Sequence, residues 1–463
     1  MSKTILTVNS PYNQEKLGSF NTQDWPSVSE KIEQAQAIFH KRDEWLPVHE
    51  RVGILERTAR LMGKHHSALA MQIAKEGGKP LKDALVEVTR AIDGLRLAEE
   101  TIRSESGHVI PMNGTVAGVN KLAMTQKEPI GVVVAVSAFN HPLNLIVHQV
   151  ASAVAAGCPV LVKPANDTPL SCQSFITLLI EAGLPEVWCQ CIIPQDRTIA
   201  ERLVTDSRIS FFSFIGSANV GWKLRSKLAP GTRCSLEHGG VAPVILNDAS
   251  KLQSAVESIT KGGFYHAGQV CVSVQRVFVH EDIASRFLTL FKETANALKV
   301  GDPTLIETEV GPLIRAAEVS RVDSWVKEAV EMGADCICGG TPIGEQCYAP
   351  TILFNPPAEA SVSKHEIFGP VVCVYPYSDI DKAITQANNL PFAFQAAVFT
   401  ESLKTAMHCY KHLNASAVMI NDHSAFRVDN MPFAGLKQSG LGVGGIKHTI
   451  DDMQIEKMLV MST

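Results

Sequence analysis

Apolar residues recur at helical spacing through the first quarter of the chain. Between about residues 28 and 98 they repeat a few positions apart, as at Ile54, Leu55, Leu61, Met62 and Leu69. Residues at such spacing lie on one face of an α-helix and pack together on a core. The pattern predicts that helices dominate this segment.

The spacing changes at residue 131, where apolar runs begin to alternate with helical segments. Residues 131–139 (GVVVAVSAF) form a β-branched apolar run, residues 142–157 (PLNLIVHQVASAVAAG) have helical composition, and residues 158–165 (CPVLVKPA) form a second short apolar run. A buried strand, a crossover helix and a second strand make the unit from which parallel sheets are built.

The same alternation continues toward the C-terminus in two stretches. Further helices are predicted at residues 171–182, 198–204, 217–228, 252–262 and 283–298, and further strands at 187–193, 209–216, 242–248, 276–280, 371–377, 416–422 and 456–461. We therefore expect an α/β protein in two halves, each with a parallel sheet covered by helices, and a cleft between the halves.

Composition narrows the compartment and the partners. The 463 residues include 42 Lys and Arg against 47 Asp and Glu, a net charge of −5 with no basic block. This balance argues against nucleic acid or a membrane as a partner. The 11 cysteines are odd in number and absent from the first third, so they form no disulfide framework. Because a secretory signal and an apolar run of about 18 residues are also missing, we expect a cytoplasmic protein.

Three side chains with complementary chemistry stand at the ends of predicted elements. Cys271 follows a Gly-Gln pair by two positions, Glu237 precedes two glycines, and Asn140 ends the first apolar run. A thiol, a carboxylate and an amide are the nucleophile, general base and oxyanion donor that acyl chemistry through a thioester requires. Taken singly, each also fits a structural role, as a core cysteine, a solvated carboxylate or a turn residue.

Seven motifs follow one another in a fixed order around these residues: EPIGVVVAVSAFNHPLN, VLVKPANDTPL, FIGSANVG, LEHGGVAPV, GQVCVSVQR, EIFGPVV and MPFAGLKQSGLG. On these motifs the chain resembles the aldehyde dehydrogenase superfamily from about residue 30 to the end. The resemblance implies two Rossmann-like parallel-sheet domains with a small bridging and oligomerisation β-sheet. The expected limits are 1–109 and 131–238 for the NAD(P)-binding domain, 239–429 for the catalytic domain, and 110–130 and 430–463 for the oligomerisation segment.

The resemblance also implies a reaction. In the family, the cysteine that matches Cys271 attacks the aldehyde carbonyl. The amide that matches Asn140 and the cysteine's own backbone N–H hold the resulting oxyanion. Hydride then leaves for the nicotinamide, which produces a thioester, and the glutamate that matches Glu237 activates the water that releases the acid.

The cofactor contacts that the resemblance implies are Phe139, Lys163, Ala165, Asn166, Gly216, Ser217, Glu366 and Phe368. Asn166 stands where the family usually has a glutamate, whose carboxylate pairs with a ribose hydroxyl and repels a 2′-phosphate. NAD and NADP therefore both stay open as the cofactor. His238 replaces the usual leucine after the base; it either tunes Glu237 electrostatically or faces outward, and the second interpretation is favoured.

The substrate contacts are predicted from position alone. His141 and His148 recur near one face of the helix expected after the first strand, which suggests a polar substrate. Arg427 lies in the segment that closes the family's substrate tunnel. It pairs either with a carboxylate, phosphonate or sulfonate of the substrate or, as a structural residue, with Asp422 or Asp429.

Two further motifs are not interpreted as ligand sites. Residues 440–445 (GLGVGG) match a dinucleotide fingerprint but follow no predicted strand. The C-x-C pairs at 189–191 and 336–338 lack a second ligand pair at zinc-like spacing, so we expect core packing and no metal.

The sequence thus predicts an NAD(P)-dependent aldehyde dehydrogenase that oxidises a small polar aldehyde to the carboxylic acid. A CoA-acylating semialdehyde dehydrogenase and a non-catalytic structural homologue are the alternatives. The short apolar run at 456–461 resembles an edge strand that needs a cover, and in the family a C-terminal strand crosses to a neighbouring subunit. We therefore expect a homodimer or homotetramer.

Overall fold

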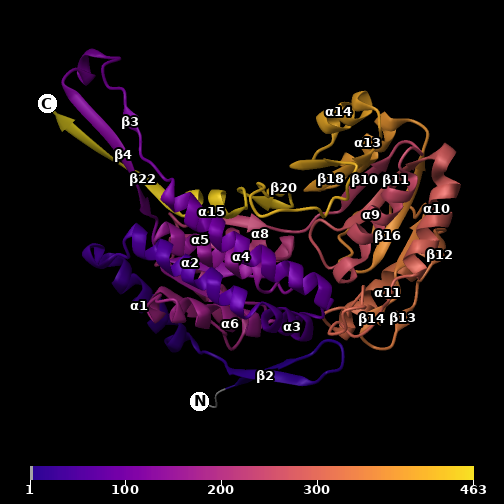
Figure 1. The fold of residues 1–463 in the computed structure, drawn as a ribbon, viewed down its shortest axis with the longest axis horizontal. Coiled ribbons are helices and arrows are strands. Elements are labelled where there is room, and N and C mark those ends of the chain that lie inside the picture. Colours follow the sequence, from indigo (N-terminus) through magenta and orange to yellow (C-terminus); the bar gives the residue numbers. More distant parts are fainter. Residues whose placement is uncertain (1–3) are drawn as a thin grey trace.

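Two large sheets stand side by side in the computed structural model, which describes residues 4–463 (Figure 1). The first sheet has six strands, in the order β21 (Gly440–Leu441), β9 (Arg233–Glu237), β8 (Phe211–Ile215), β5 (Val133–Val136), β6 (Val160–Lys163) and β7 (Cys189–Cys191). Strands β5 to β9 are parallel, and β21 is antiparallel to β9. The α/β class predicted from the sequence is confirmed.

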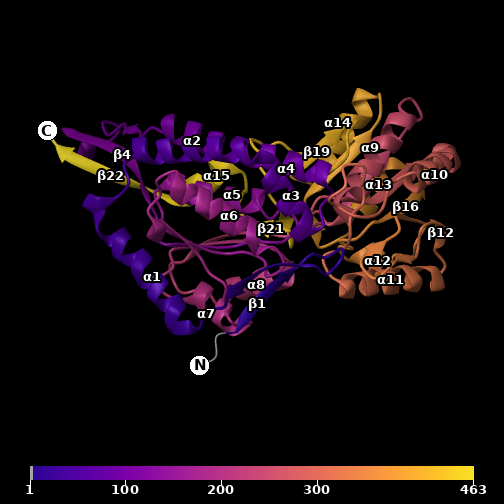
Figure 2. The same cartoon turned by 60° about the horizontal axis from the view of Figure 1, so that its bottom comes forward.

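Helices cover both faces of this sheet (Figure 2). One layer holds α2 (Val48–Lys64), α3 (His66–Gly77), α4 (Leu81–Arg103), α5 (Asn144–Ala156) and α6 (Pro169–Glu181), and the other holds α1 (Trp25–His40), α7 (Arg197–Thr205) and α8 (Ala218–Arg225). Side chains point to opposite faces of a strand in turn. Val133 and Ala135 therefore join the core under the first layer, while Val132 and Val134 join the core under the second.

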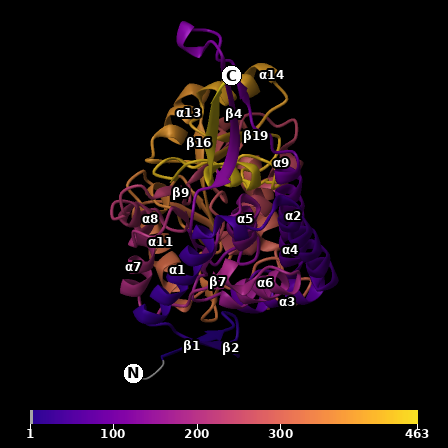
Figure 3. The ribbon, with the colours of Figure 1, turned by 90° about the vertical axis from the view of Figure 1, so that its left-hand side faces the viewer.

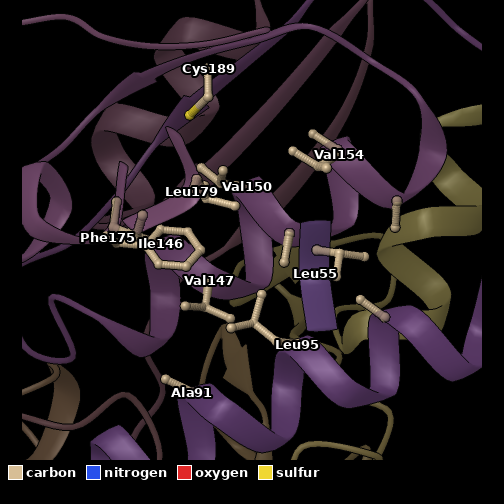
Figure 4. Close-up of a cluster of buried hydrophobic side chains, with 14 of the residues drawn as sticks. Leu55, Ala91, Leu95, Ile146, Val147, Val150, Val154, Phe175, Leu179 and Cys189 are labelled. Atoms are coloured by element: carbon tan, nitrogen blue, oxygen red, sulfur yellow. The ribbon is translucent and has the colours of Figure 1, made fainter. Parts of the chain in front are cut away.

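Helix α5 is buried on all sides and fixes the position of the loop that precedes it. It packs against α4, α2 and a short helix, α15 (Ile446–Asp452), and Figure 4 shows its residues Ile146, Val147 and Val150 among the side chains of Leu95 and Phe175. A helix that is apolar all round belongs in the interior. The backbone just before α5 is thereby held firmly at the edge of the sheet.

The second sheet has seven strands, in the order β12 (Asp335–Cys338), β15 (Thr351–Phe354), β16 (Val371–Tyr377), β11 (Val274–His280), β10 (Ala242–Leu246), β18 (Gln395–Phe399) and β19 (Ala417–Ile420). Helices α9 (Leu252–Phe264), α10 (Glu281–Asn296) and α11 (Ala316–Glu331) cover one face, and α13 (Ile380–Asn388) and α14 (Leu403–His412) cover the other. The C-x-C prediction holds for Cys189, which is buried, and is wrong for Cys336, which is exposed on the antiparallel edge strand β12.

A three-stranded sheet of β22 (Gln454–Ser462), β4 (Lys121–Pro129) and β3 (Val109–Ile110) projects from the first half as an arm (Figures 1 and 3). β22 pairs with β4 along its whole length, so the predicted terminal strand exists and is longer than expected. Its residues Met458, Leu459 and Val460 are exposed on the arm. The sequence pattern did not predict the N-terminal hairpin of β1 (Ile5–Asn9) and β2 (Lys16–Asn21).

No helix within residues 4–463 combines the length and the apolar character that a membrane crossing requires. The predicted domain limits stay predictions.

Candidate active site

Four of the predicted site residues lie at the carboxyl edge of the first sheet. Asn140 follows β5, Lys163 ends β6, Gly216 follows β8 and Glu237 ends β9. The chain runs from β5 outward to β6 and β7 and then returns to the other side of β5 to form β8 and β9. Parallel sheets bind ligands in the crevice where the strand order reverses in this way.

The opposite wall comes from the second sheet. Cys271 precedes β11, and Glu366 and Phe368 precede β16, so the amino ends of these strands face the carboxyl edge of the first sheet across a cleft of about 540 Å³. The cleft brings together all predicted catalytic and cofactor residues: Asn140, Glu237, Cys271, Phe139, Lys163, Ala165, Asn166, Gly216, Ser217, Glu366 and Phe368. Their roles stay predictions.

A left-handed turn presents the thiol of Cys271. Residues 266–268 have φ angles of 49°, 54° and 69° in succession, a region that favours glycine. A Cβ on Gly268 would lie 2.2 Å from the backbone oxygen of Gly369, so only glycine fits at that position. Beyond the turn, the backbone oxygen of Cys271 accepts a hydrogen bond from the N–H of Gly240 at 3.0 Å, which ties the two walls together.

The thiol of Cys271 is protonated at neutral pH. Burial raises its pKa well above the ordinary value, and the nearby carboxylates of Glu237 and Glu366 raise it further, while the charge of Arg427 opposes them. The thiolate is the nucleophilic form of a cysteine. For Cys271 to act as a nucleophile, a neighbouring base would have to take this proton.

The amide of Asn140 is held by the same loop that carries the thiol. Its Nδ2 donates to the backbone oxygen of Gln269 at 2.9 Å. The Gln269 side chain is fixed in turn, since its Nε2 donates to the backbone oxygen of Pro312 and its Oε1 accepts from the N–H of Ile314. A primary amide has two hydrogens, so one hydrogen of Asn140 is left for a ligand near Cys271.

Two buried carboxyl groups face the cleft. Burial raises the pKa of Glu237 to about 7, against the opposing charge of Arg427. Burial raises the pKa of Glu366 to about 8. Its Oε1 has no hydrogen-bond partner within residues 4–463 and lies where a Cβ on Gly239 would come within 1.7 Å. The carboxyl of Glu366 thus packs on bare backbone, with one oxygen unpartnered.

The cleft residues fit a dinucleotide. The ammonium of Lys163 lies 3.3 Å from Oδ1 of Asn166 at the end of β6. Gly216 and Ser217 immediately precede helix α8, whose first N–H groups suit an anion. The rings of Phe139 and Phe368 meet edge to face at 5.7 Å across the cleft. The unpartnered oxygen of Glu366 completes a set of donors and acceptors along one crevice.

The favoured interpretation of His238 is wrong, because its side chain does not face outward. The ring is buried between Phe214 and Trp222, and its Nδ1 lies 2.8 Å from the backbone oxygen of Gly216. It therefore supports the turn before α8. The pKa of Glu237 is set by burial and Arg427, so His238 does not tune the carboxylate either.

A smaller pocket of about 50 Å³ adjoins the cleft and shares Cys271 and Glu237 with it. It gathers the predicted substrate residues and several polar ones that the sequence did not single out: His141, His148 and Arg427, together with Arg90, Asn144 and Tyr265. The sequence around Arg90 gave no indication that this residue belongs to the site, because its partner Asp429 lies 339 positions away in the chain.

Asp429 organises one wall of this pocket. It accepts both arms of the Arg90 guanidinium at 2.8 and 2.9 Å, Nε2 of His148 at 2.7 Å and Nδ2 of Asn144 at 3.2 Å. These partners hold the pKa of Asp429 well below its usual range despite burial. His148 thus lines the pocket, but its Nε2 is engaged by the protein.

Arg427 also lines this pocket, but it takes no part in the hydrogen bonds around Asp429. Its Nη1 is buried without a hydrogen-bond partner in residues 4–463, and its guanidinium lies 3.6 Å over the ring of Phe433. Burial lowers its pKa to about 10, so it stays charged at neutral pH. No hydrogen bond or ion pair joins Arg427 to Asp422 or Asp429 in the described chain, so the predicted structural pairing is wrong.

A thiol, an amide and two carboxyl groups at the facing edges of two parallel sheets define a class of α/β enzyme with a dinucleotide crevice beside a reactive cysteine. No group of three or more His, Cys, Asp or Glu side chains in residues 4–463 is arranged to hold a metal ion. Comparison with known families agrees with this class. Residues 1–459 match the model of the aldehyde dehydrogenase family, and the chain belongs to that family.

Named relatives extend the comparison. A 3-sulfolactaldehyde dehydrogenase from Priestia aryabhattai is 36% identical over 439 residues, which are 94% of this chain and 92% of the relative. The structure of aldehyde dehydrogenase 21 from Physcomitrella patens, in complex with the reaction product succinate, matches with a TM-score of 0.95 and 34% identity over 100% of this chain and 95% of that one. The glyceraldehyde-3-phosphate dehydrogenase of Methanocaldococcus jannaschii, complexed with NADP, matches with a TM-score of 0.94 and 31% identity over 100% of both chains.

Proposed function

We propose that this protein oxidises a small aldehyde carrying an anionic group to the corresponding carboxylate, with NAD or NADP as hydride acceptor. The observation that supports an anionic group on the substrate is the half-buried guanidinium of Arg427, which lines the pocket next to Cys271 and whose Nη1 has no hydrogen-bond partner in residues 4–463. A buried charge is stable only when it is paired, and a planar guanidinium suits carboxylate, sulfonate or phosphate oxygens. The relatives named above act on, or were crystallised with, molecules of this kind.

The reaction begins with a proton transfer inside the site. Glu237, with a pKa of about 7, takes the thiol proton of Cys271 as the sulfur attacks the aldehyde carbon. The carbonyl π electrons move to oxygen. The free hydrogen of the Asn140 amide and the backbone N–H of Cys271 stabilise that charge.

The cleft residues hold the cofactor for the next step. Lys163 and Asn166 bind the adenosine ribose, the turn at Gly216 and Ser217 binds the pyrophosphate, and Glu366 binds the nicotinamide ribose. When bound, NAD or NADP accepts the hydride that leaves the carbon attached to Cys271, and a thioester remains on the sulfur.

Hydrolysis completes the cycle. Glu237 first releases the thiol proton to solvent. It then takes a proton from a water molecule, whose oxygen attacks the thioester carbon, and the C–S bond breaks as Glu237 returns this proton to the departing sulfur. Sulfur returns as the thiol of Cys271 and the product leaves as the carboxylate. A buried base at this position supports water as the acyl acceptor, in preference to the CoA-acylating alternative.

Reduction of NAD or NADP with matched aldehydes tests the proposal. We expect turnover without CoA, and at least about tenfold higher kcat/KM for short aldehydes with a carboxylate, sulfonate or phosphate than for their uncharged counterparts. Cys271→Ala should abolish turnover, while Cys336→Ala, at an exposed cysteine, should not change it. Strict dependence on CoA, or no reduced cofactor with any aldehyde, would overturn it.

We also propose that the protein works in the cytoplasm as a homodimer or homotetramer. Eleven cysteines with no disulfide among them suit a reducing compartment. The arm of β22 exposes Met458, Leu459 and Val460 beside an unpaired strand edge, a surface that a second copy would cover.

A further inference from the structure

A buried ion pair lies beneath the loop that carries Asn140. Lys79 follows helix α3, Glu87 lies on α4, and their side chains are in direct contact with only 1% of each exposed. Glu87 Oε1 also accepts the N–H groups of Leu143 and Asn144 at 2.9 and 3.1 Å, which caps the start of α5. The reaction proposed above uses neither member of this pair.

Lys79 makes a second contact that determines the chemistry of His141. Its ammonium nitrogen lies 2.7 Å from Nδ1 of His141, while the nearest oxygen of Glu87 is 3.6 Å from the same Nδ1. A charged ammonium has three donors and no acceptor. Nδ1 of His141 must therefore accept, which leaves the ring hydrogen of the neutral imidazole on Nε2.

The surroundings keep this imidazole neutral. Burial and the charge of Lys79 lower the pKa of His141 to about 4, with a smaller contribution from Arg90, and Glu87 opposes them only in part. The neighbouring ring of His266 is also neutral, because burial lowers its pKa well below the usual value. His141 thus remains an uncharged donor throughout the range in which an ordinary histidine titrates.

The free nitrogen of His141 faces the reacting centre. Its ring lines both the cofactor cleft and the small pocket, beside Cys271. Nε2 has no hydrogen-bond partner in residues 4–463 and is not among the fully buried atoms, so it opens to the pocket space. His266, by contrast, lines neither the cleft nor the small pocket, and both its ring nitrogens are buried without partners in residues 4–463.

We propose that Lys79 is a positioning residue that holds His141 as the Nε2–H tautomer, and that His141 donates this hydrogen to an oxygen atom on the substrate carbon next to the aldehyde. The inference rests on the proposed function for its second half only. His141 lines the cleft together with Asn140 and the small pocket together with Arg427, so its donor adjoins both the proposed place of the carbonyl oxygen and that of the anionic group. The preferred substrates are then 2-hydroxyaldehydes with an anionic end.

The tautomer is measurable without any substrate. In protein labelled with 15N-histidine, we identify the His141 ring by the signal that disappears in His141→Phe, and we expect this ring to be neutral, to carry its hydrogen on Nε2 and not to titrate from about pH 6 to about pH 8. In Lys79→Met the lysine charge is gone and Glu87 remains, so this ring should become doubly protonated near pH 6. The same change at exposed Lys82, which pairs with Glu309, should leave the signal unchanged. An Nδ1–H tautomer in the unaltered protein overturns the first half of the proposal.

Kinetics test the second half. His141→Phe should lower kcat/KM for an anionic 2-hydroxyaldehyde by about 10- to 100-fold and for its 2-deoxy analogue by less than about threefold. Lys79→Met should act in the same direction, mainly through KM. Equal losses for both aldehydes would show that His141 does not recognise the hydroxyl, even if the tautomer is as expected. Absence of activity in the unaltered protein would instead refute the proposed function and leave the tautomer result standing.

Discussion

The raised pKa of Glu237 predicts how turnover depends on pH. Burial raises its pKa to about 7, and the charge of Arg427 holds it from rising further. A general base works only when ionised, so turnover limited by this group must rise with pH and level off above the pKa. With a pKa of about 7, about half of the carboxyl is ionised at pH 7 and about a tenth at pH 6, which predicts an approximately fivefold slower reaction at pH 6.

Glu237→Gln removes the base and keeps the shape of the side chain. Loss of a positioned general base lowers turnover by about 10²- to 10⁴-fold. The variant should also lose the rise of rate with pH that is centred near 7. Glu257→Gln, at an exposed position on α9, is the matched control and should behave like the unaltered protein.

Steady-state formation of reduced cofactor from pH 5.5 to pH 9, analysed as kcat/KM for an anionic aldehyde, measures both effects in the free enzyme. A Glu237→Gln variant with turnover within about tenfold of the original would refute the role of this carboxyl. So would a variant that keeps the same pH midpoint, because the titrating group would then lie elsewhere, with Glu366 as the nearest candidate.

Three further predictions follow from single contacts. Arg427→Met, measured by the same assay, should raise KM for an anionic aldehyde by about 10- to 100-fold and leave KM for an uncharged aldehyde nearly unaffected; equal changes in the two KM values would contradict the anion site. Gly239→Ala places a Cβ within 1.7 Å of the Glu366 carboxyl and should weaken cofactor binding at least about tenfold by fluorescence titration. Gly63→Ala, where no atom lies within 4 Å, is its control. Leu459→Asp on the exposed arm should convert the oligomer to monomers by light scattering, and an unchanged mass would place the interface elsewhere.

The fold was predictable because its signals are local. The alternation of Val132, Val133 and Val134 between two cores is a period-two pattern. The largely apolar composition of α5 can likewise be read from one contiguous stretch of the sequence. Asn140 was singled out because it ends a local apolar run and Glu237 because two glycines and an apolar run follow it, whereas Lys163 was assigned from the family resemblance. The N-terminal hairpin was missed because its strands are mostly exposed and carry no apolar alternation.

The contacts between distant segments were not predictable from the sequence. His238 was expected to face outward because a polar residue after a strand usually does, but the rings of Phe214 and Trp222 enclose it. For Arg427, one of the two expected partners was an aspartate close in sequence, but Asp429 binds Arg90, far away on α4. In each case the contact partner depends on how helices and loops pack in three dimensions, and a local sequence pattern does not contain that information.

The small pocket links the recognition of the substrate to the strength of the base. Arg427 lowers the pKa of Glu237 through its charge, and Asp429 does not neutralise it because Arg90 and His148 already occupy that carboxylate. An anionic group bound to Arg427 cancels part of this charge, so the pKa of Glu237 must rise in the substrate complex. The profile of kcat reports the complex and that of kcat/KM reports the free enzyme. The midpoint for kcat should therefore lie above that for kcat/KM with an anionic aldehyde and coincide with it for an uncharged one; coinciding midpoints for both aldehydes would mean that Arg427 does not hold the anionic group.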